Sequence, residues 1–131
     1  MTGIDTNVLV RYFMDDDPAQ ANRVEVFMRE CRTKGERIFV SSIVLCEFAW
    51  TLRTTFRMDR AGILRSIEEL LDSELFVVEQ DDEVRSAVHF ARTSKGDFPD
   101  YLIGAIGMEK GCRFTVTFDR ALEGHPCFRT I

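Results

Sequence analysis

The sequence lacks several features that would each indicate a class of protein. It contains no run of 18 apolar residues that could cross a bilayer. No basic segment followed by an apolar one opens the chain, so we expect neither a secretory signal nor a membrane partner. It also has no internal repeat and no low-complexity tract. These absences favour an ordinary globular protein.

The sequence also lacks the closely spaced cysteines and histidines that would indicate a zinc site or a disulfide framework. The four cysteines stand far apart, without a C-x-x-C pair: Cys31, Cys46, Cys112 and Cys127. His89 and His125 are the only histidines, and they supply no closely spaced ligand pair for zinc. We therefore expect reduced, mostly buried thiols in a cytoplasmic protein, and structural roles for both histidines.

The sequence has fewer basic residues than acidic ones. Seventeen Lys and Arg residues face 22 Asp and Glu residues, which gives a net charge of -5. This balance argues against a protein that coats nucleic acid, because such proteins are normally basic. It leaves a nuclease open, since a local basic patch can still guide a phosphate backbone.

Short strand signals alternate with helical ones along the 131 residues, which fits one domain over residues 1–131. We expect strands that end at Asp5 and cover 37–40, 75–78, 114–118 and 128–131. Helices are expected near 7–13, 18–34, 42–53, 59–71, 82–94 and 98–110. The alternation predicts an α/β fold of three α/β/α layers, with a central, mostly parallel sheet of four to five strands.

Local signals place several helix ends. Asp17 is a predicted N-cap with Pro18 in the first turn, and Gly35 ends the same helix. Asp81 or Asp82 is expected to cap the fifth helix. Eleven phenylalanines predict an aromatic interior, in which we expect Phe27, Met28 and Trp50.

Two acids fall at the carboxyl ends of predicted strands, where ligands of such sheets bind. These are Asp5, which could equally be the N-cap of the next helix, and Asp119. Carboxylates about 4 Å apart repel by roughly 4 kcal/mol at an effective dielectric near 20. A hard divalent cation between them, Mg²⁺ or Mn²⁺, relieves that repulsion.

Further polar residues are candidates for the same site. Glu47 lies among apolar neighbours in its helix, and its alternatives are an exposed position or an ion pair with Arg53. Asp97 and Asp100 flank Phe98-Pro99 at a helix start, which needs only one capping acid. Thr117 points the same way as Asp119 in an extended segment, so both could face one pocket.

The ordered set of motifs resembles PIN-domain ribonucleases, and most closely the VapC-type toxins of bacterial toxin–antitoxin pairs. The segments that carry the resemblance are Asp5–Leu9, Ser41–Glu47, Asp97–Ile103 and Thr117–Leu122. They cover essentially the whole chain in order and spacing. Each motif is short, but the ordered set is specific.

The resemblance implies a Mg²⁺- or Mn²⁺-dependent endoribonuclease that cleaves single-stranded RNA. It also implies homodimers and inhibition by a small VapB-like antitoxin. Asp5, Glu47, Asp100 and Asp119 match the acidic quartet that binds the metal. The supporting positions that match are Asn7, Asp97 and Thr117.

Four arginines are candidates for contacts with phosphate, with a solvated or ion-paired position as the alternative: Arg11, Arg53, Arg57 and Arg120. Arg120 is favoured because it directly follows Asp119.

Two other functions remain open. One is a Mg²⁺-dependent phosphatase of the haloacid-dehalogenase type, although Asn7 stands where that group needs an acid. The other is a PIN-like module that binds metal or a partner without cleaving.

Overall fold

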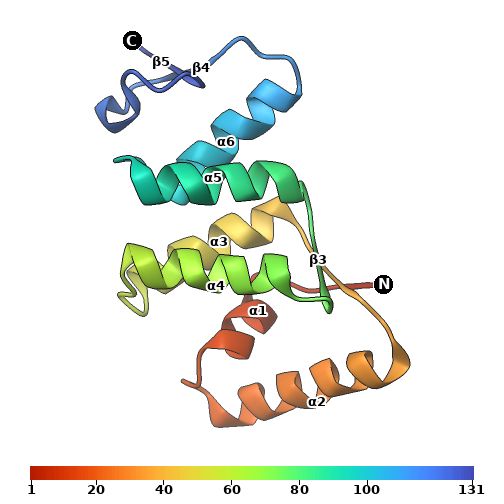
Figure 1. The fold of residues 1–131 in the computed structure, drawn as a ribbon. Helices are drawn as coiled ribbons and strands as arrows, with labels where there is room; N and C mark the ends of the chain where they lie inside the picture. Colours follow the sequence, from red (N-terminus) through yellow and green to blue (C-terminus); the bar gives the residue numbers. More distant parts are fainter. The chain divides into compact units, whose positions relative to one another are not determined.

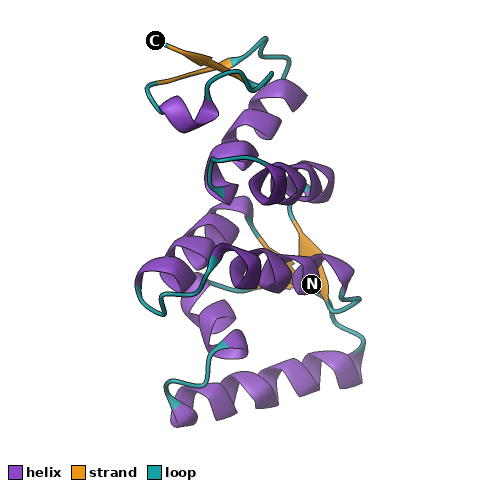
Figure 2. Ribbon diagram, turned by 60° about the vertical axis from the view of Figure 1, so that its left-hand side comes forward, coloured by secondary structure: helices purple, strands orange, loops and turns teal.

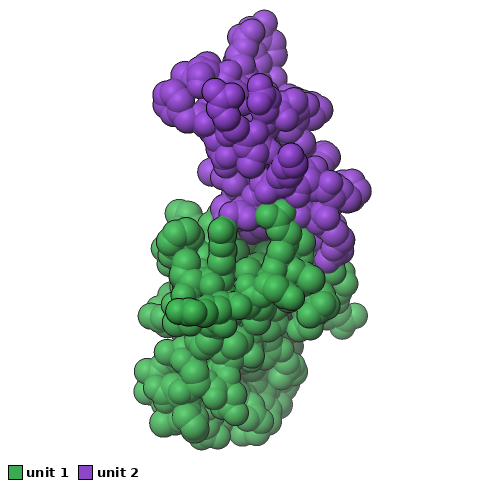
Figure 3. Space-filling model, turned by 90° about the vertical axis from the view of Figure 1, so that its left-hand side faces the viewer, with its two compact units in different colours: residues 1–79 green, residues 80–131 purple.

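The structure is a computed structural model that describes all residues from 1 to 131. The chain divides into two compact units, Met1–Glu79 and Gln80–Ile131, coloured separately in Figure 3. Both units contain helices and short strands, and Figure 2 shows the two kinds of element in different colours. Every strand pairing is parallel, which confirms the predicted α/β class.

Unit 1 holds a three-stranded sheet and four helices (Figure 1). Its elements are β1 (Thr2–Gly3), α1 (Thr6–Phe13), α2 (Pro18–Lys34), β2 (Ile38–Val40), α3 (Ser42–Thr54), α4 (Arg60–Asp72) and β3 (Phe76–Val78). The strand order is β1-β2-β3, with Thr2 opposite Ile38 in the register of the first pair. Helix α3 packs against both α1 and α4.

Unit 2 holds a helix pair and a two-stranded parallel sheet. Its elements are α5 (Asp81–Thr93), α6 (Phe98–Glu109), β4 (Thr115–Thr117), the 3₁₀ turn η1 (Arg120–Leu122) and β5 (Phe128–Thr130). Helices α5 and α6 pack side by side (Figure 1). The five strands thus fall in two sheets of three and two, where the sequence predicted one sheet, because the hydrogen bonds of each sheet stay within its own unit.

Most of the expected helix ends are confirmed. The side chain of Asp17 accepts a hydrogen bond from the backbone N–H of Gln20 at 3.1 Å, with Pro18 in the first turn of α2. Gly35 ends α2 at a positive φ of 65°, which glycine adopts without a steric penalty. Ser41 caps α3 through the N–H of Val44 at 3.2 Å.

The start of α5 differs from the prediction of a cap at Asp81 or Asp82. The N-cap is Gln80, which has left-handed backbone angles (φ 55°, ψ 50°) and no capping hydrogen bond from its side chain. Both aspartates lie one step later, in the first helical turn together with Glu83. There they interact favourably with the positive end of the helix dipole, which needs no cap geometry.

The apolar stripes predicted for the helices form the cores of the two units. In unit 1 the core includes Met28, Phe48 and the α4 residues Ile63, Leu64, Ile67 and Leu70. Phe27 is only half-buried. Trp50 is 64% exposed on α3, so its predicted place in the core is wrong: the core side of that helix is taken by Leu45, Phe48, Ala49 and Leu52.

An aromatic cluster organises unit 2 around His125. Its ring lies 4.4 Å from that of Phe90 and 5.0 Å from that of Tyr101, measured between centroids. The backbone N–H of Cys127 donates a hydrogen bond to its Nδ1 at 3.3 Å, and its buried Nε2 has no partner. Desolvation by burial lowers the pKa of His125.

All four cysteines are free thiols. Only Cys31 is buried, whereas Cys46 and Cys127 are half-buried and Cys112 is exposed, so the expectation of mostly buried thiols is met for one cysteine alone. Burial raises the pKa of Cys31, Cys46 and Cys127, so these three thiols resist ionisation.

None of the helices has the length and apolar character needed to cross a membrane.

The close packing at Gly96 generates a first prediction. A Cβ at this position would lie 2.9 Å from Cζ of the buried Tyr101 and would clash with Cδ2 of Leu122. Gly96→Ala should therefore lower the free energy of unfolding by about 1–3 kcal/mol, measured by urea denaturation. Gly3→Ala is the control, because a Cβ there meets nothing within 4 Å. Equal stability of the two variants would contradict the packing described.

A second prediction concerns acid stability. Because the folded pKa of His125 is below its unfolded value of about 6.5, the unfolded state binds the proton more readily. The contribution of neutral His125 to stability is therefore complete above about pH 6.5 and is lost as the pH falls below it. His125→Phe keeps an aromatic ring and should lose less unfolding free energy than the wild type between pH 7.5 and 5. Parallel pH profiles for the two proteins would exclude His125 as a source of acid sensitivity.

Candidate functional site

Asp5 stands where β1 passes into α1. It has extended backbone angles (φ -90°, ψ 175°) and is the N-cap of α1. Its Oδ1 accepts a hydrogen bond from the N–H of Val8 at 3.0 Å. The carboxylate is exposed, so Oδ2 is available to a further partner. The capping role and a ligand role therefore use different oxygens of the same side chain.

Glu47 is joined to the start of α1 by a hydrogen bond that spans 41 residues of sequence. The hydroxyl of Thr6, the residue after Asp5, donates to Glu47 Oε2 at 2.6 Å. Glu47 is exposed, which fits one alternative in the sequence prediction and removes the cost of burying its charge. The fold thus brings Glu47 beside the residue that follows Asp5.

Sequence reasoning missed Thr6, although its place directly after Asp5 was a usable signal. A hydroxyl at the first helical position lies close to the cap side chain and points out of the helix. Nothing local indicates its acceptor, because Glu47 is brought there by the packing of α1 on α3.

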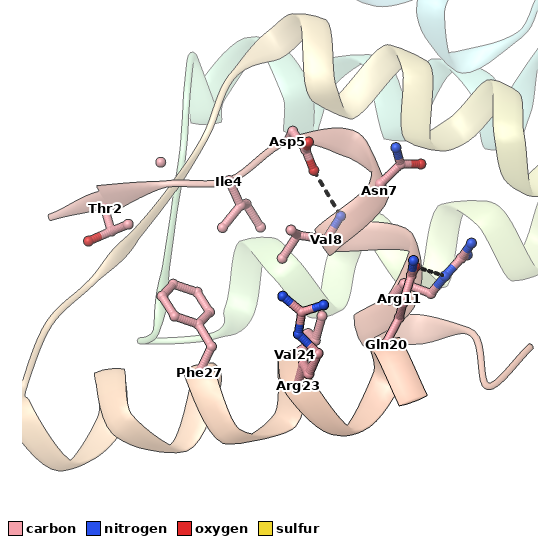
Figure 4. A pocket seen from close by; sticks show the side chains of 11 residues that line it. Thr2, Ile4, Asp5, Asn7, Val8, Arg11, Gln20, Arg23, Val24 and Phe27 are labelled. Atoms are coloured by element: carbon pink, nitrogen blue, oxygen red, sulfur yellow. Dashed lines mark hydrogen bonds between the residues drawn. The ribbon is translucent and has the colours of Figure 1, made fainter. Parts of the chain in front are cut away.

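A cleft with a volume of about 600 Å³ opens beside Asp5 within unit 1. It lies between β1, the first turns of α1 and one face of α2 (Figure 4). Asn7 lines it on the same turn as Asp5, as Figure 4 shows. The cleft therefore places two of the predicted polar residues at one opening.

Arg11 also lines this cleft, but its charge is already matched. Its Nη1 lies 3.0 Å from Asp16 Oδ1, and its Nε donates to Gln20 Oε1 at 3.0 Å. The ion-paired alternative considered for this arginine is therefore the one observed.

In unit 2, Asp97 and Asp100 together begin α6. Asp97 is the N-cap, and its backbone N–H donates to Asp100 Oδ2 at 3.2 Å in a capping box. Both side chains are half-buried. Asp100 therefore has a capping function of its own, which accounts for the second acid at this helix start.

Asp119 follows β4 and caps η1. Its Oδ1 accepts from the N–H of Ala121 at 2.8 Å, and its own N–H donates to Thr117 Oγ1 at 3.0 Å. The hydroxyl of Thr117 thus holds the backbone of Asp119 in place. Arg120, the next residue, is exposed.

Within each unit the acids are brought into pairs rather than clusters. Glu47 accepts a hydrogen bond from Thr6, the residue after Asp5, whereas Asp97 and Asp100 share one helix start. No three His, Cys, Asp or Glu side chains form a metal-sized group. The donors themselves fit a hard cation: they are carboxylate oxygens, and at Asp5 and Asp119 the recorded hydrogen bond engages Oδ1 alone.

Comparison with known proteins identifies the family. The family model described as "PIN domain" matches residues 4–125. A protein of Aquifex aeolicus (strain VF5) named "VapC ribonuclease" is 30% identical over 120 residues, which cover 92% of this chain and 88% of that protein. The match begins one residue before Asp5 and extends beyond Asp119, so it includes every residue predicted for the site. The chain belongs to the PIN-domain family.

Proposed function

We propose that this chain is a Mg²⁺- or Mn²⁺-dependent endoribonuclease, the toxin of a VapC-type toxin–antitoxin pair. The observation that carries the proposal is the hydrogen bond from Thr6, the residue after Asp5, to Glu47, in a chain that matches the PIN family over residues 4–125. The related protein is named as a ribonuclease, which supports RNA as the substrate. The phosphatase alternative has no comparable support.

The proposed site uses Asp5, Glu47, Asp100 and Asp119 as the acids that hold the metal. Their oxygen donors suit Mg²⁺ and Mn²⁺. When bound, such an ion supplies Lewis-acid chemistry that activates water and offsets charge on phosphoryl oxygens. Asn7, Asp97 and Thr117 support the site, and we propose that both units act as one nuclease domain over residues 1–131.

The chain's own residues hold this acidic set in place by helix capping. Asp5, Asp97 and Asp119 are each the N-cap of a helix or 3₁₀ turn. Backbone N–H groups of the first turn donate to the carboxylates of Asp5 and Asp119 and so fix their direction. Arg120 and Arg53 are proposed phosphate contacts, since both are exposed. Arg11 is a weaker candidate because Asp16 already pairs with it.

The partners follow from the same proposal. A VapB-like antitoxin would inhibit the enzyme, and two copies of the chain would form a homodimer. Four free cysteines are consistent with a reducing cytoplasm as the place of action.

The proposal is tested by removing one charge and keeping the helix cap. Asn is as good an N-cap as Asp, so Asp5→Asn should fold normally. Loss of a metal ligand should reduce Mn²⁺-dependent cleavage of RNA by at least about 100-fold. Cleavage of a fluorescent RNA, with and without chelator, measures the effect. Asp59→Asn is the matched control, because Asp59 caps α4 through the N–H of Gly62 at 2.8 Å and lies outside the proposed site. Full activity of Asp5→Asn would refute the assignment.

Thr6 gives a second test, as a positioning residue that acts through Glu47. Thr6→Val removes the hydroxyl and keeps the shape, so Glu47 loses its 2.6 Å hydrogen bond. We expect the Mn²⁺ concentration at half-maximal activity to rise about 10-fold. Thr6→Ser retains the hydroxyl and should restore the wild-type metal dependence. An unchanged metal titration in Thr6→Val would show that this contact does not orient Glu47.

A further inference from the structure

The cleft beside Asp5 contains features that the acidic site does not use. Its wall on α2 carries Arg23 and Phe27, which lie four residues apart and therefore on one face of the helix. Figure 4 shows both side chains reaching from α2 toward β1 and the start of α1. Asp5 lies on the opposite side of the same opening.

Arg23 is a cation without an acidic partner. It is exposed, and no ion pair or hydrogen bond engages its guanidinium. Arg11, the other arginine of the cleft, is neutralised by Asp16 at 3.0 Å. In a chain with a net charge of -5, an unmatched guanidinium inside a cleft is a ready contact for a phosphate, which its planar fork can bind through two hydrogen bonds.

Phe27 supplies an aromatic face at the same wall. Its ring is half-buried and has no aromatic neighbour, whereas Tyr12 and Phe13 pair with other rings. In Figure 4 the ring lies close to Ile4, at the end of the cleft away from Arg11. A flat apolar face that is open to solvent is what an unstacked nucleobase requires.

We propose that this cleft is a nucleotide subsite, which takes one unpaired nucleotide of single-stranded RNA next to the phosphate to be cleaved. The base stacks on Phe27 and its phosphate contacts Arg23, while Asp5 faces the reacting group. The volume of about 600 Å³ lies within the range of small-molecule sites. The inference rests on the proposed ribonuclease function and adds the residues that hold the substrate.

A protein segment is a less suitable occupant. Ile4, Val8 and Val24 give the cleft some apolar lining, but an unmatched cation and a proposed metal ligand share the same opening, whereas a helix-binding groove relies on apolar anchors at helical spacing. Paired RNA is also unsuitable, because its bases are stacked on each other and present no free face.

The experiment measures binding and cleavage separately. Binding of a fluorescent single-stranded RNA is measured in the inactive Asp119→Asn background, and Mn²⁺-dependent cleavage in the otherwise wild-type chain. Arg23→Gln should lower the slope of log affinity against log salt by about 0.7, the value for one phosphate contact on a single strand. Phe27→Ala should weaken binding about 10-fold with the salt slope unchanged.

Matched variants distinguish the loss of a stacking or charge contact with RNA from a general disturbance of α2. Arg29→Gln changes an exposed arginine of α2 that does not line the cleft, and it should leave binding unchanged. Phe27→Leu keeps apolar bulk and should bind as weakly as Phe27→Ala, whereas Phe27→Trp keeps an aromatic face and should retain the affinity. An RNA with an abasic site beside the cleaved bond should bind the wild type and Phe27→Leu equally.

The outcomes distinguish this inference from the proposed function. If the wild type cleaves RNA, and Arg23→Gln and Phe27→Ala match Arg29→Gln in KM and salt slope, the subsite is overturned and the ribonuclease stands. If those two variants lose affinity for a protein partner while RNA binding is intact, the cleft is a protein-docking surface and the inference is again overturned. If the wild type neither binds nor cleaves RNA under any metal condition, the proposed function itself fails.

Discussion

Hydrogen bonds from helix starts to carboxylates are the constraint on which the proposed site depends. Asp5 accepts from Val8, Asp100 from Asp97, and Asp119 from Ala121. Each bond fixes the direction of a carboxylate through backbone atoms, which move less than side chains. Each also places a carboxylate at the amino-terminal end of a helix or turn. At Asp5 and Asp119 the capping hydrogen bond engages Oδ1, so capping and the proposed metal binding are compatible there.

Glu47 is held differently, and the difference explains the importance of Thr6. It lies in the middle of α3, where no free N–H groups are available to orient it. The hydroxyl of Thr6 replaces them and connects the second structural element of unit 1 to its fifth. Because Glu47 is exposed, its charge carries no cost of burial.

Local chemistry explains which parts of the fold could be predicted from the sequence. The α2 boundaries follow from Asp17, Pro18 and Gly35, whose preferences depend on their own backbone geometry. Tertiary contacts decide the rest. The bond between Thr6 and Glu47, the left-handed cap at Gln80 and the exposure of Trp50 depend on residues that lie far along the chain or on how elements pack. The pairing of Arg11 with Asp16 depends on the loop between α1 and α2, whose course no periodicity specifies.

The brevity of β1 has a consequence for how the protein tolerates change. This strand contributes only two residues to the sheet and holds its register through Thr2 opposite Ile38 and Gly3 opposite Phe39. A slip of a single position would turn each of its side chains to the other side of the pleat. The chain would then enter α1 one residue early or late. Ile4 or Thr6 would stand where Asp5 stands now, at the N-cap of α1. Insertions or deletions ahead of Asp5 should thus be far more harmful than substitutions there, although they alter no proposed functional group.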